Sequence, residues 1–240
     1  MRIIITENYE QMSERAAEIV ARVVTDKPDA VLGLATGTTP LGLYERLIAD
    51  RAANGTDYGR VRTVNLDEYM GLPKTHEQSY AHFMRKNLFD AIGIKPENTN
   101  IENGEASDEK AECERYDRVL EELPRDFQLL GLGSNGHIAF NEPNTPFGST
   151  THVVTLADST VKDNSRLFAD IADVPRKAFT MGLKSIMHAK KILVLASGAN
   201  KADAVYGMTR GEIKESLPAS VLQLHPDCTL IIDKAAAARL

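Results

Sequence analysis

Residues 30–48 read AVLGLATGTTPLGLYERLI, and this stretch predicts a buried strand that turns into a helix. The run Ala30–Ala35 is continuously apolar, as expected for a strand covered on both faces of a sheet. The segment Thr36-Gly37-Thr38-Thr39-Pro40 can turn the chain, because glycine tolerates unusual backbone angles and proline suits a first helical turn. The apolar residues that follow have the spacing of one helix face: Leu41, Tyr44, Leu47 and Ile48.

The same alternation of strand-like and helix-like segments continues along the whole chain. Helical spacing recurs in two further stripes, the second preceded by Ser107 as a predicted N-cap: Met12, Ala16, Ile19, Val20 and Val23, then Tyr116, Val119, Leu120 and Leu123. The predicted strands are Arg2–Thr6, Ala30–Ala35, Val61–Leu66, Phe127–Leu132, His152–Leu156, Ala178–Met181, Lys191–Ala196 and Cys228–Ile232. This order predicts a Rossmann-like α/β fold: one domain over residues 1–240, with a doubly wound, mostly parallel sheet and helices on both faces.

Composition and charge exclude several classes of protein. The chain has 240 residues, of which 42% are hydrophobic and 26% charged, and its formal net charge of −6 with no basic run argues against nucleic-acid binding. No signal-peptide pattern and no membrane-spanning apolar run is present, so we expect a cytoplasmic protein that does not bind a membrane. Cys113 and Cys228 share no metal or redox spacing, which suits a reducing compartment.

The segment Thr36–Thr39 has the features of a phosphate cradle. Backbone N–H groups, the dipole of the following helix and three hydroxyl groups would all face an anion. The spacing of a Walker A loop is absent. An ordinary turn with a threonine cap remains the alternative for this segment taken alone.

Two adjacent carboxylates, Asp67 and Glu68, follow the predicted strand Val61–Leu66. Their adjacency is not the arrangement of a glycosidase pair. One carboxylate could face a pocket as a general base while the other faces solvent or pairs with a cation. A solvated turn is the alternative.

The richest segment is Gly131–Pro143, which reads GLGSNGHIAFNEP. Its first six residues match the G-x-G-x-x-G pattern of dinucleotide sites, but the prolines that follow leave no helix to hold a pyrophosphate. A histidine and a glutamate at a strand end favour acid–base chemistry instead. Residues 141–151 then predict a long irregular loop of the kind that often serves as a lid or binding segment. No ligand spacing in the chain indicates a metal site, so we expect neither metal nor cofactor.

Two later cations are candidate anion ligands. Lys201 follows a buried strand and a glycine, a position that faces the carboxyl edge of a sheet, where ligands of such folds bind. For Arg166 the only indication is that it follows the polar residues Asn164 and Ser165.

Together these segments resemble the glucosamine-6-phosphate deaminase family. The resemblance rests on runs that span nearly the whole chain in the family's order: ATGTTP at 35–40, LDEYMGL at 66–72, EQSY at 77–80, GHIAFNEP at 136–143, NSR at 164–166 and LQLHP at 222–226. It implies conversion of glucosamine 6-phosphate and water to fructose 6-phosphate and ammonia.

The resemblance also implies residue roles. His137 would open the sugar ring, with Glu142 orienting its imidazole, and Asp67, ionised at neutral pH, would remove the proton at carbon 2. The phosphate would be held by the loop of Thr36, Gly37, Thr38 and Thr39, together with Arg166 and Lys201.

Two departures from the family pattern carry expectations of their own. Some members have Asp where this chain has Asn135, which can accept a hydrogen bond from an imidazole but cannot neutralise it, so we expect Glu142 to carry more of that role. Members activated by N-acetylglucosamine 6-phosphate resemble one another in a basic pair, here His152 and Val154. We therefore expect no activation, a hyperbolic rate curve and an assembly that need not be a hexamer, although a homo-oligomer remains possible.

Three alternatives remain. A 6-phosphogluconolactonase resembles this fold and its phosphate loop, but it would not need the Asp67-Glu68-Tyr69 and Phe140-Asn141-Glu142-Pro143 runs. A non-catalytic sugar-phosphate sensor would not need the acid–base residues. A nucleotide-dependent oxidoreductase rests only on the glycine pattern.

Overall fold

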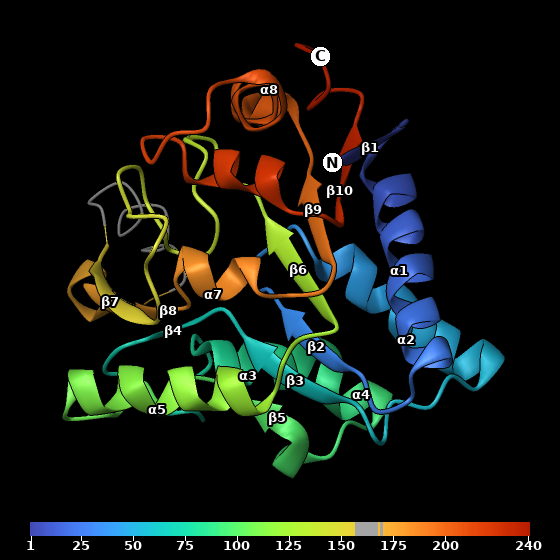
Figure 1. Ribbon diagram of the computed structural model, residues 1–240. Helices are drawn as coiled ribbons and strands as arrows, with labels where there is room; N and C mark the ends of the chain where they lie inside the picture. The colour runs from blue at the N-terminus through green and yellow to red at the C-terminus, as the bar shows by residue number, and fades with distance from the viewer. Residues whose placement is uncertain (157–167, 169) are drawn as a thin grey trace.

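The computed structural model of the protein describes residues 1–156, 168 and 170–240 (Figure 1). Ten strands are found in these ranges: β1 (Arg2–Thr6), β2 (Val31–Leu34), β3 (Arg62–Asn65), β4 (Asp67–Tyr69), β5 (Thr99–Asn100), β6 (Phe127–Gly131), β7 (His152–Thr155), β8 (Lys177–Thr180), β9 (Ile192–Ala196) and β10 (Cys228–Asp233). The α-helices are α1 (Tyr9–Asp26), α2 (Leu41–Asn54), α3 (Tyr80–Met84), α4 (Asp90–Ile92), α5 (Glu109–Glu122), α7 (Leu183–Met187) and α8 (Ala202–Arg210), with a π-helical turn at Arg85–Phe89 between α3 and α4.

The main sheet has seven strands in the order β1-β10-β9-β6-β2-β3-β5, and every pairing in it is parallel. The chain winds outward from β2 through β3 to β5, and in the other direction from β6 through β9 to β10. The winding therefore reverses between β2 and β6, and ligands of such folds bind beyond the strand ends at this point. Figure 1 shows α1 and α2 on one side of this sheet and α5 and α7 on the other, as predicted.

All eight predicted strands form, but two of them leave the main sheet. β7 and β8 pair antiparallel with each other, and β8 pairs antiparallel with the unpredicted strand β4. This second sheet, in the order β4-β8-β7, places Asp67 directly opposite Thr180. Only Leu66 separates the end of β3 from the start of β4, so the chain passes from the main sheet into the small sheet at Asp67.

Side-chain caps explain where the helices begin. The side chains of Asn8, Ser79 and Asp108 accept hydrogen bonds from backbone N–H groups in the first turns of α1, α3 and α5. The predicted cap at Ser107 is therefore wrong by one residue, since the Asp108 carboxylate takes the N–H of Ala111.

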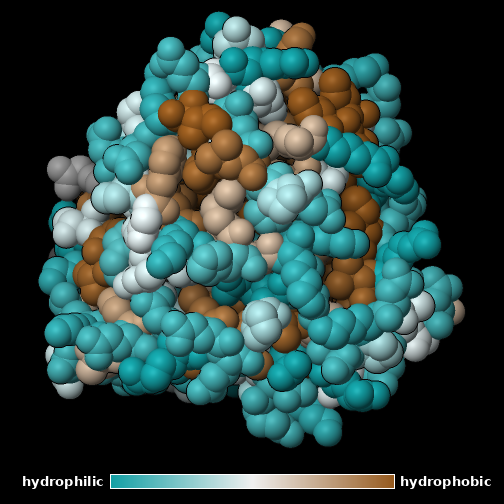
Figure 2. Space-filling model, viewed as in Figure 1, coloured by the Kyte–Doolittle hydropathy of each residue, from teal (hydrophilic) through white to brown (hydrophobic). Residues whose placement is uncertain are grey.

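The core lies on both faces of the main sheet, with a smaller apolar cluster around the second sheet. β2 and β9 are buried along their whole length, as their continuous apolar sequences predict. The surface in Figure 2 is mostly hydrophilic, and its brown patches include one over the turn Pro218–Leu224, where Leu224 is exposed. Within the described ranges, no helix combines the length and apolarity needed to cross a membrane.

Candidate active site

The loop after β2 lies at the switch point of the sheet and has the conformation that its sequence predicts. Gly37 has a φ of +88°, which favours glycine, and a side chain there would project into open space rather than into protein. Thr36 lies close to the hydroxyl group of Tyr80, which donates to the hydroxyl of Tyr69 at 3.2 Å. Tyr9 on α1, which no sequence pattern singles out, fixes the loop: its hydroxyl donates toward the carbonyls of Thr38 and Thr39 at 3.1 Å each.

A cavity of about 620 Å³ unites this loop with the turn after β9. Thr38, Thr39 and Lys201 all line it, together with Ser197 and Asn200. Partial burial holds the pKa of Lys201 below its usual range, and a bound anion would offset that effect by favouring the charged ammonium. The predicted phosphate ligands Thr38, Thr39 and Lys201 therefore meet in one place.

Asp233, at the end of β10, shapes the turn that carries Lys201. Its carboxylate accepts the Ser197 hydroxyl and the backbone N–H groups of Gly198 and Ala236. Burial raises the pKa of Asp233, but these hydrogen bonds outweigh it and leave the pKa below the ordinary value. An acid at the carboxyl end of an apolar strand was the sequence signal that could have identified this residue.

The adjacent carboxylates Asp67 and Glu68 are both buried but differ in their hydrogen bonds. Glu68 is buried and accepts three backbone N–H groups, those of Tyr69, Tyr80 and Ala81, each at 2.9 Å. It therefore holds the start of α3 and does not face solvent, one of the two expectations for the second carboxylate, while Lys74 is near enough for its charge to act on Glu68. Asp67 is also buried, at 7% exposure, yet among the described residues no hydrogen bond to its carboxyl group is found.

The protonation of Asp67 differs from what the sequence suggested. Burial, followed by the nearby charge of Glu68, raises the pKa of Asp67 to about 8. This carboxyl group is therefore mostly protonated at neutral pH, whereas an ionised group was expected. A pKa near the working pH suits a general base, because the group can both take and return a proton.

His137, Glu142 and Asn135 form one cluster after β6. His137 Nδ1 lies 3.4 Å from Glu142 Oε1, an ion-pair distance without the alignment of a hydrogen bond. Asn135 Nδ2 donates to Glu142 Oε2 at 2.7 Å, and Asn135 Oδ1 accepts the backbone N–H of His137 at 3.1 Å. The contact with His137, helped by Asn135, lowers the pKa of Glu142. Asn135 thus acts on Glu142 and on the backbone, rather than on the imidazole as expected.

Gly133 is required by the position of the His137 ring. A side-chain carbon at Gly133 would lie 2.4 Å from His137 Cε1 and Nδ1, which is inside any permitted contact. No helix follows this glycine-rich segment before β7, so the dinucleotide reading of its pattern is wrong in context.

The His137 cluster and Asp67 are joined through the second sheet. The backbone N–H of Phe140 donates to the hydroxyl of Thr180, the residue that pairs with Asp67. The Phe140 ring stacks on Tyr80 with centroids 6.2 Å apart, and the Tyr80 hydroxyl lies close to Thr36 in the phosphate loop. The buried side-chain amide of Asn141, in the segment that follows His137, donates to the backbone carbonyls of Ile138 and Met181 and fixes that segment in place. These contacts bring the acid–base groups and the phosphate loop to the same edge of the protein.

Not every predicted site residue can be placed. Arg166 lies outside the described residues. Within the described part of the chain, no group of three or more His, Cys, Asp and Glu side chains is arranged to hold a metal ion.

Comparison with known sequences identifies relatives over the full length. Residues 6–231 match the profile of the family described as glucosamine-6-phosphate isomerases/6-phosphogluconolactonase. Glucosamine-6-phosphate deaminase from Thermoanaerobacter pseudethanolicus is 52% identical over 238 residues, which cover 99% of this chain and 94% of the relative. The deaminase from Clostridium novyi is 50% identical over 241 residues and the whole of both chains.

Solved structures with high and with low sequence identity to this chain share its fold. A structure described as a monomeric glucosamine-6-phosphate deaminase superposes with a TM-score of 0.97 at 47% identity, over 100% of both chains. The 6-phosphogluconolactonase from Trypanosoma cruzi superposes with a TM-score of 0.80 at 19% identity, over 100% of this chain and 96% of that one. The second likeness extends to the fold alone.

Proposed function

The chain belongs to the glucosamine-6-phosphate isomerase/6-phosphogluconolactonase family, and within it we propose that the protein converts glucosamine 6-phosphate and water to fructose 6-phosphate and ammonia. This is the activity of a glucosamine-6-phosphate deaminase, a hydrolase of amino-sugar metabolism. The observation that carries the proposal is Asp67, a buried carboxyl group with no hydrogen-bond partner among the described residues and a pKa raised to about 8, at the same edge of the protein as the His137–Glu142 pair.

Ring opening is the first step, and it falls to His137. The imidazole takes the proton from the hydroxyl at carbon 1 and returns one to the ring oxygen as the ring bond breaks. Glu142 stabilises the imidazolium that forms between these transfers, because its lowered pKa keeps it charged at neutral pH. Asn135 holds the carboxylate of Glu142 in place.

Isomerisation follows on the open chain, and Asp67 is its base. The carboxylate removes the proton at carbon 2 while the ammonium group there gives a proton to the carbonyl oxygen at carbon 1, which leaves a neutral enolamine between carbons 1 and 2. A proton delivered to carbon 1 turns the enolamine into an iminium ion at carbon 2. Water then adds at carbon 2 and ammonia leaves, which completes the ketone.

The phosphate group is bound in the cavity between the loop after β2 and Lys201. Thr36, Gly37, Thr38 and Thr39 supply hydroxyl and backbone N–H donors, and Lys201 supplies a point charge. Arg166 is proposed as a further ligand from the sequence resemblance alone. The chemistry described here uses side chains only, and we propose that it needs no cofactor.

Assembly and location complete the proposal. We propose that the protein is a monomer, since the relative of TM-score 0.97 is described as monomeric. We also propose a cytoplasmic location, which suits free thiols at Cys113 and Cys228 and a phosphorylated substrate.

Ammonia release from glucosamine 6-phosphate by the purified protein, with EDTA present, tests the function. We expect ammonia and fructose 6-phosphate in equal amounts. Folded protein that releases neither product would contradict the proposal, and hydrolysis of 6-phosphogluconolactone by the same preparation would favour the lactonase alternative.

A further inference from the structure

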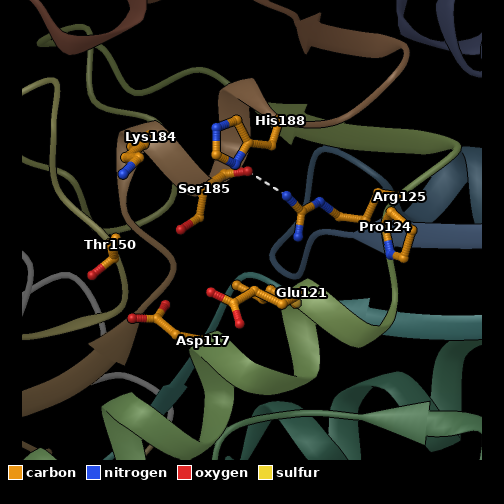
Figure 3. Close-up of a pocket in the computed structure, with 9 residues that line it drawn as sticks. Asp117, Glu121, Pro124, Arg125, Thr150, Lys184, Ser185 and His188 are labelled. Carbon is orange, nitrogen blue, oxygen red and sulfur yellow. Dashed lines mark hydrogen bonds between the residues drawn. The ribbon is translucent and has the colours of Figure 1, made fainter.

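A second cavity lies away from the proposed active site. Its volume is about 290 Å³, near the lower end of the range for small-molecule sites. It is lined by residues of α5, of the turn between α5 and β6, and of α7 (Figure 3). The turn before β6 is at the amino edge of the main sheet, whereas the proposed active site follows the carboxyl ends of the strands.

Arg125, in that turn, is the residue that makes this cavity unusual. Its side chain is only 2% exposed, and Nη2 donates to the backbone carbonyl of Ser185 on α7. Nε and Nη1 have no hydrogen-bond partner among the described residues, and no ion pair to Arg125 is found there. Burial lowers the pKa of Arg125 only to about 10, so it remains a cation at neutral pH.

A buried guanidinium without a counter-charge is costly, and proteins normally pair such a group. The bond to Ser185 accounts for one of its three nitrogens and could serve to tie β6 to α7. It leaves Nε and Nη1, both almost wholly buried, without an acceptor in a side chain that lines the cavity. We therefore expect an anionic group of a ligand to complete the pairing.

The other walls of the cavity decide what else the ligand carries. Figure 3 shows the carboxylates of Asp117 and Glu121, both on α5, facing the space between α5 and α7 opposite Arg125. Lys184 contributes a second cation from α7. Two cations and two carboxylates balance, so a phosphate dianion would meet repulsion from α5, whereas a neutral zwitterion would match both walls.

We propose that this cavity binds a small zwitterion of the α-amino-acid type. The carboxylate of the ligand pairs with Arg125, and its ammonium group lies between Asp117 and Glu121. Asp117 is already held for this role, because its Oδ1 accepts the backbone N–H of Thr151 at 2.9 Å. The second oxygen of Asp117 and the exposed carboxylate of Glu121 remain for the ligand.

The test is a thermal-shift and calorimetric screen of the dialysed full-length protein with each standard amino acid at millimolar concentration. We expect at least one to bind and to raise Tm by about 5 °C at a concentration about 100-fold above Kd. Its N-acetylated form and inorganic phosphate should bind at least about tenfold more weakly, because each lacks one of the two matched charges.

Variants locate the binding. Glu121→Gln, an exposed and therefore well-tolerated change, should weaken binding at least about tenfold, a loss typical of one charged contact. The neighbouring Glu122→Gln removes the same charge outside the cavity lining and should bind as the wild type does. Arg125→Met should abolish binding, and neither Glu121→Gln nor Glu122→Gln should change the rate of ammonia release.

Three results would overturn the proposal. The first is no binding by any amino acid to the wild-type protein. The second is equal binding by wild type and Glu121→Gln, which would place the ligand elsewhere. The third is binding of phosphate or of N-acetylated amino acids as tight as that of the free amino acid.

Discussion

At the scale of single residues, Asp67 sets the pH dependence of the proposed reaction. A general base must be ionised to act, and its pKa in the free enzyme appears in kcat/KM. With a pKa of about 8, kcat/KM should rise as the pH is raised toward 8 and level off above it. Asp67→Asn should lower kcat about 10²–10⁴-fold. A pH profile that is flat from 6 to 9 in the wild type would contradict this assignment.

The same carboxyl group should cost stability. Between pH about 4 and about 8, folded Asp67 holds a proton that the unfolded chain has released, so raising the pH across this window lowers the free energy of unfolding. Asp67→Asn has no carboxyl group to titrate here, so it does not undergo this fall in the free energy of unfolding. Urea denaturation should show the variant gaining stability over the wild type as the pH rises from 5 to 8. A constant difference would mean that Asp67 is already ionised in the folded protein.

Gly133 offers a test of the His137 position that leaves every catalytic group in the chain. Gly133→Ala places a methyl group where the imidazole now lies, so the ring must move away from Glu142. We expect a fall in kcat of about 10²-fold or more, the usual contribution of a positioned acid or base. Gly131→Ala is the matched control, because a side chain at Gly131 meets no atom within 4 Å. Equal rates for the two variants would argue against His137 as the ring-opening residue.

Glu142 and Asn135 can be ranked in the same assay. Glu142→Gln removes the charge beside His137, whereas Asn135→Ala removes only the hydrogen bond that orients this charge. The rate of ammonia release should therefore fall further in Glu142→Gln. The reverse order would show that Asn135 has a role of its own in the chemistry.

At the scale of structural elements, Glu68 belongs to the fold rather than to the reaction. It joins β4 to α3 by accepting the N–H groups of Tyr80 and Ala81. Glu68→Gln replaces one accepting oxygen by a donor and leaves a buried N–H unpaired, which should cost about 1–3 kcal/mol. Urea denaturation measures the loss, with the exposed Glu77→Gln as control. An unchanged midpoint would mean that α3 begins without this cap.

The elements show how far the sequence could predict this protein. Eight strands were predicted, several of them from continuous apolar runs such as Ile192–Ala196, because burial on both faces leaves a strong signal. β4 is only Asp67–Tyr69 and β5 only Thr99–Asn100, too short for any periodicity. Partner choice was also hidden, since β7 and β8 look like strands of the main sheet until their antiparallel pairing is seen.

The site was predictable to the same extent. Asn135, His137 and Glu142 are close in sequence, so their cluster follows from local structure. The roles of Tyr9 and Asp233 depend on contacts across the fold, and the pKa of Asp67 depends on burial. Neither long-range packing nor burial depth can be read from the residues around a site.

At the scale of the whole molecule, we propose that residues 1–240 fold as one domain, because β1 pairs with β10 and the main apolar cluster runs through the helices and strands between them. The monomer proposed above should show hyperbolic kinetics. N-acetylglucosamine 6-phosphate should not activate it, since His152 and Val154 offer no strong cationic pair on β7. Initial rates with and without that compound, beside a mass from light scattering, test both points. A sigmoidal curve relieved by the compound would contradict them.

The pairing of β1 with β10 has a consequence for how the protein is made. β1 is at the edge of the main sheet and its hydrogen-bonded neighbour there is the strand that ends at Asp233. During translation the first strand leaves the ribosome long before the last one has been synthesised. The apolar residues of β1 therefore stay without their partner strand until nearly the whole chain has emerged. Chaperones that bind nascent chains would find their target in this strand.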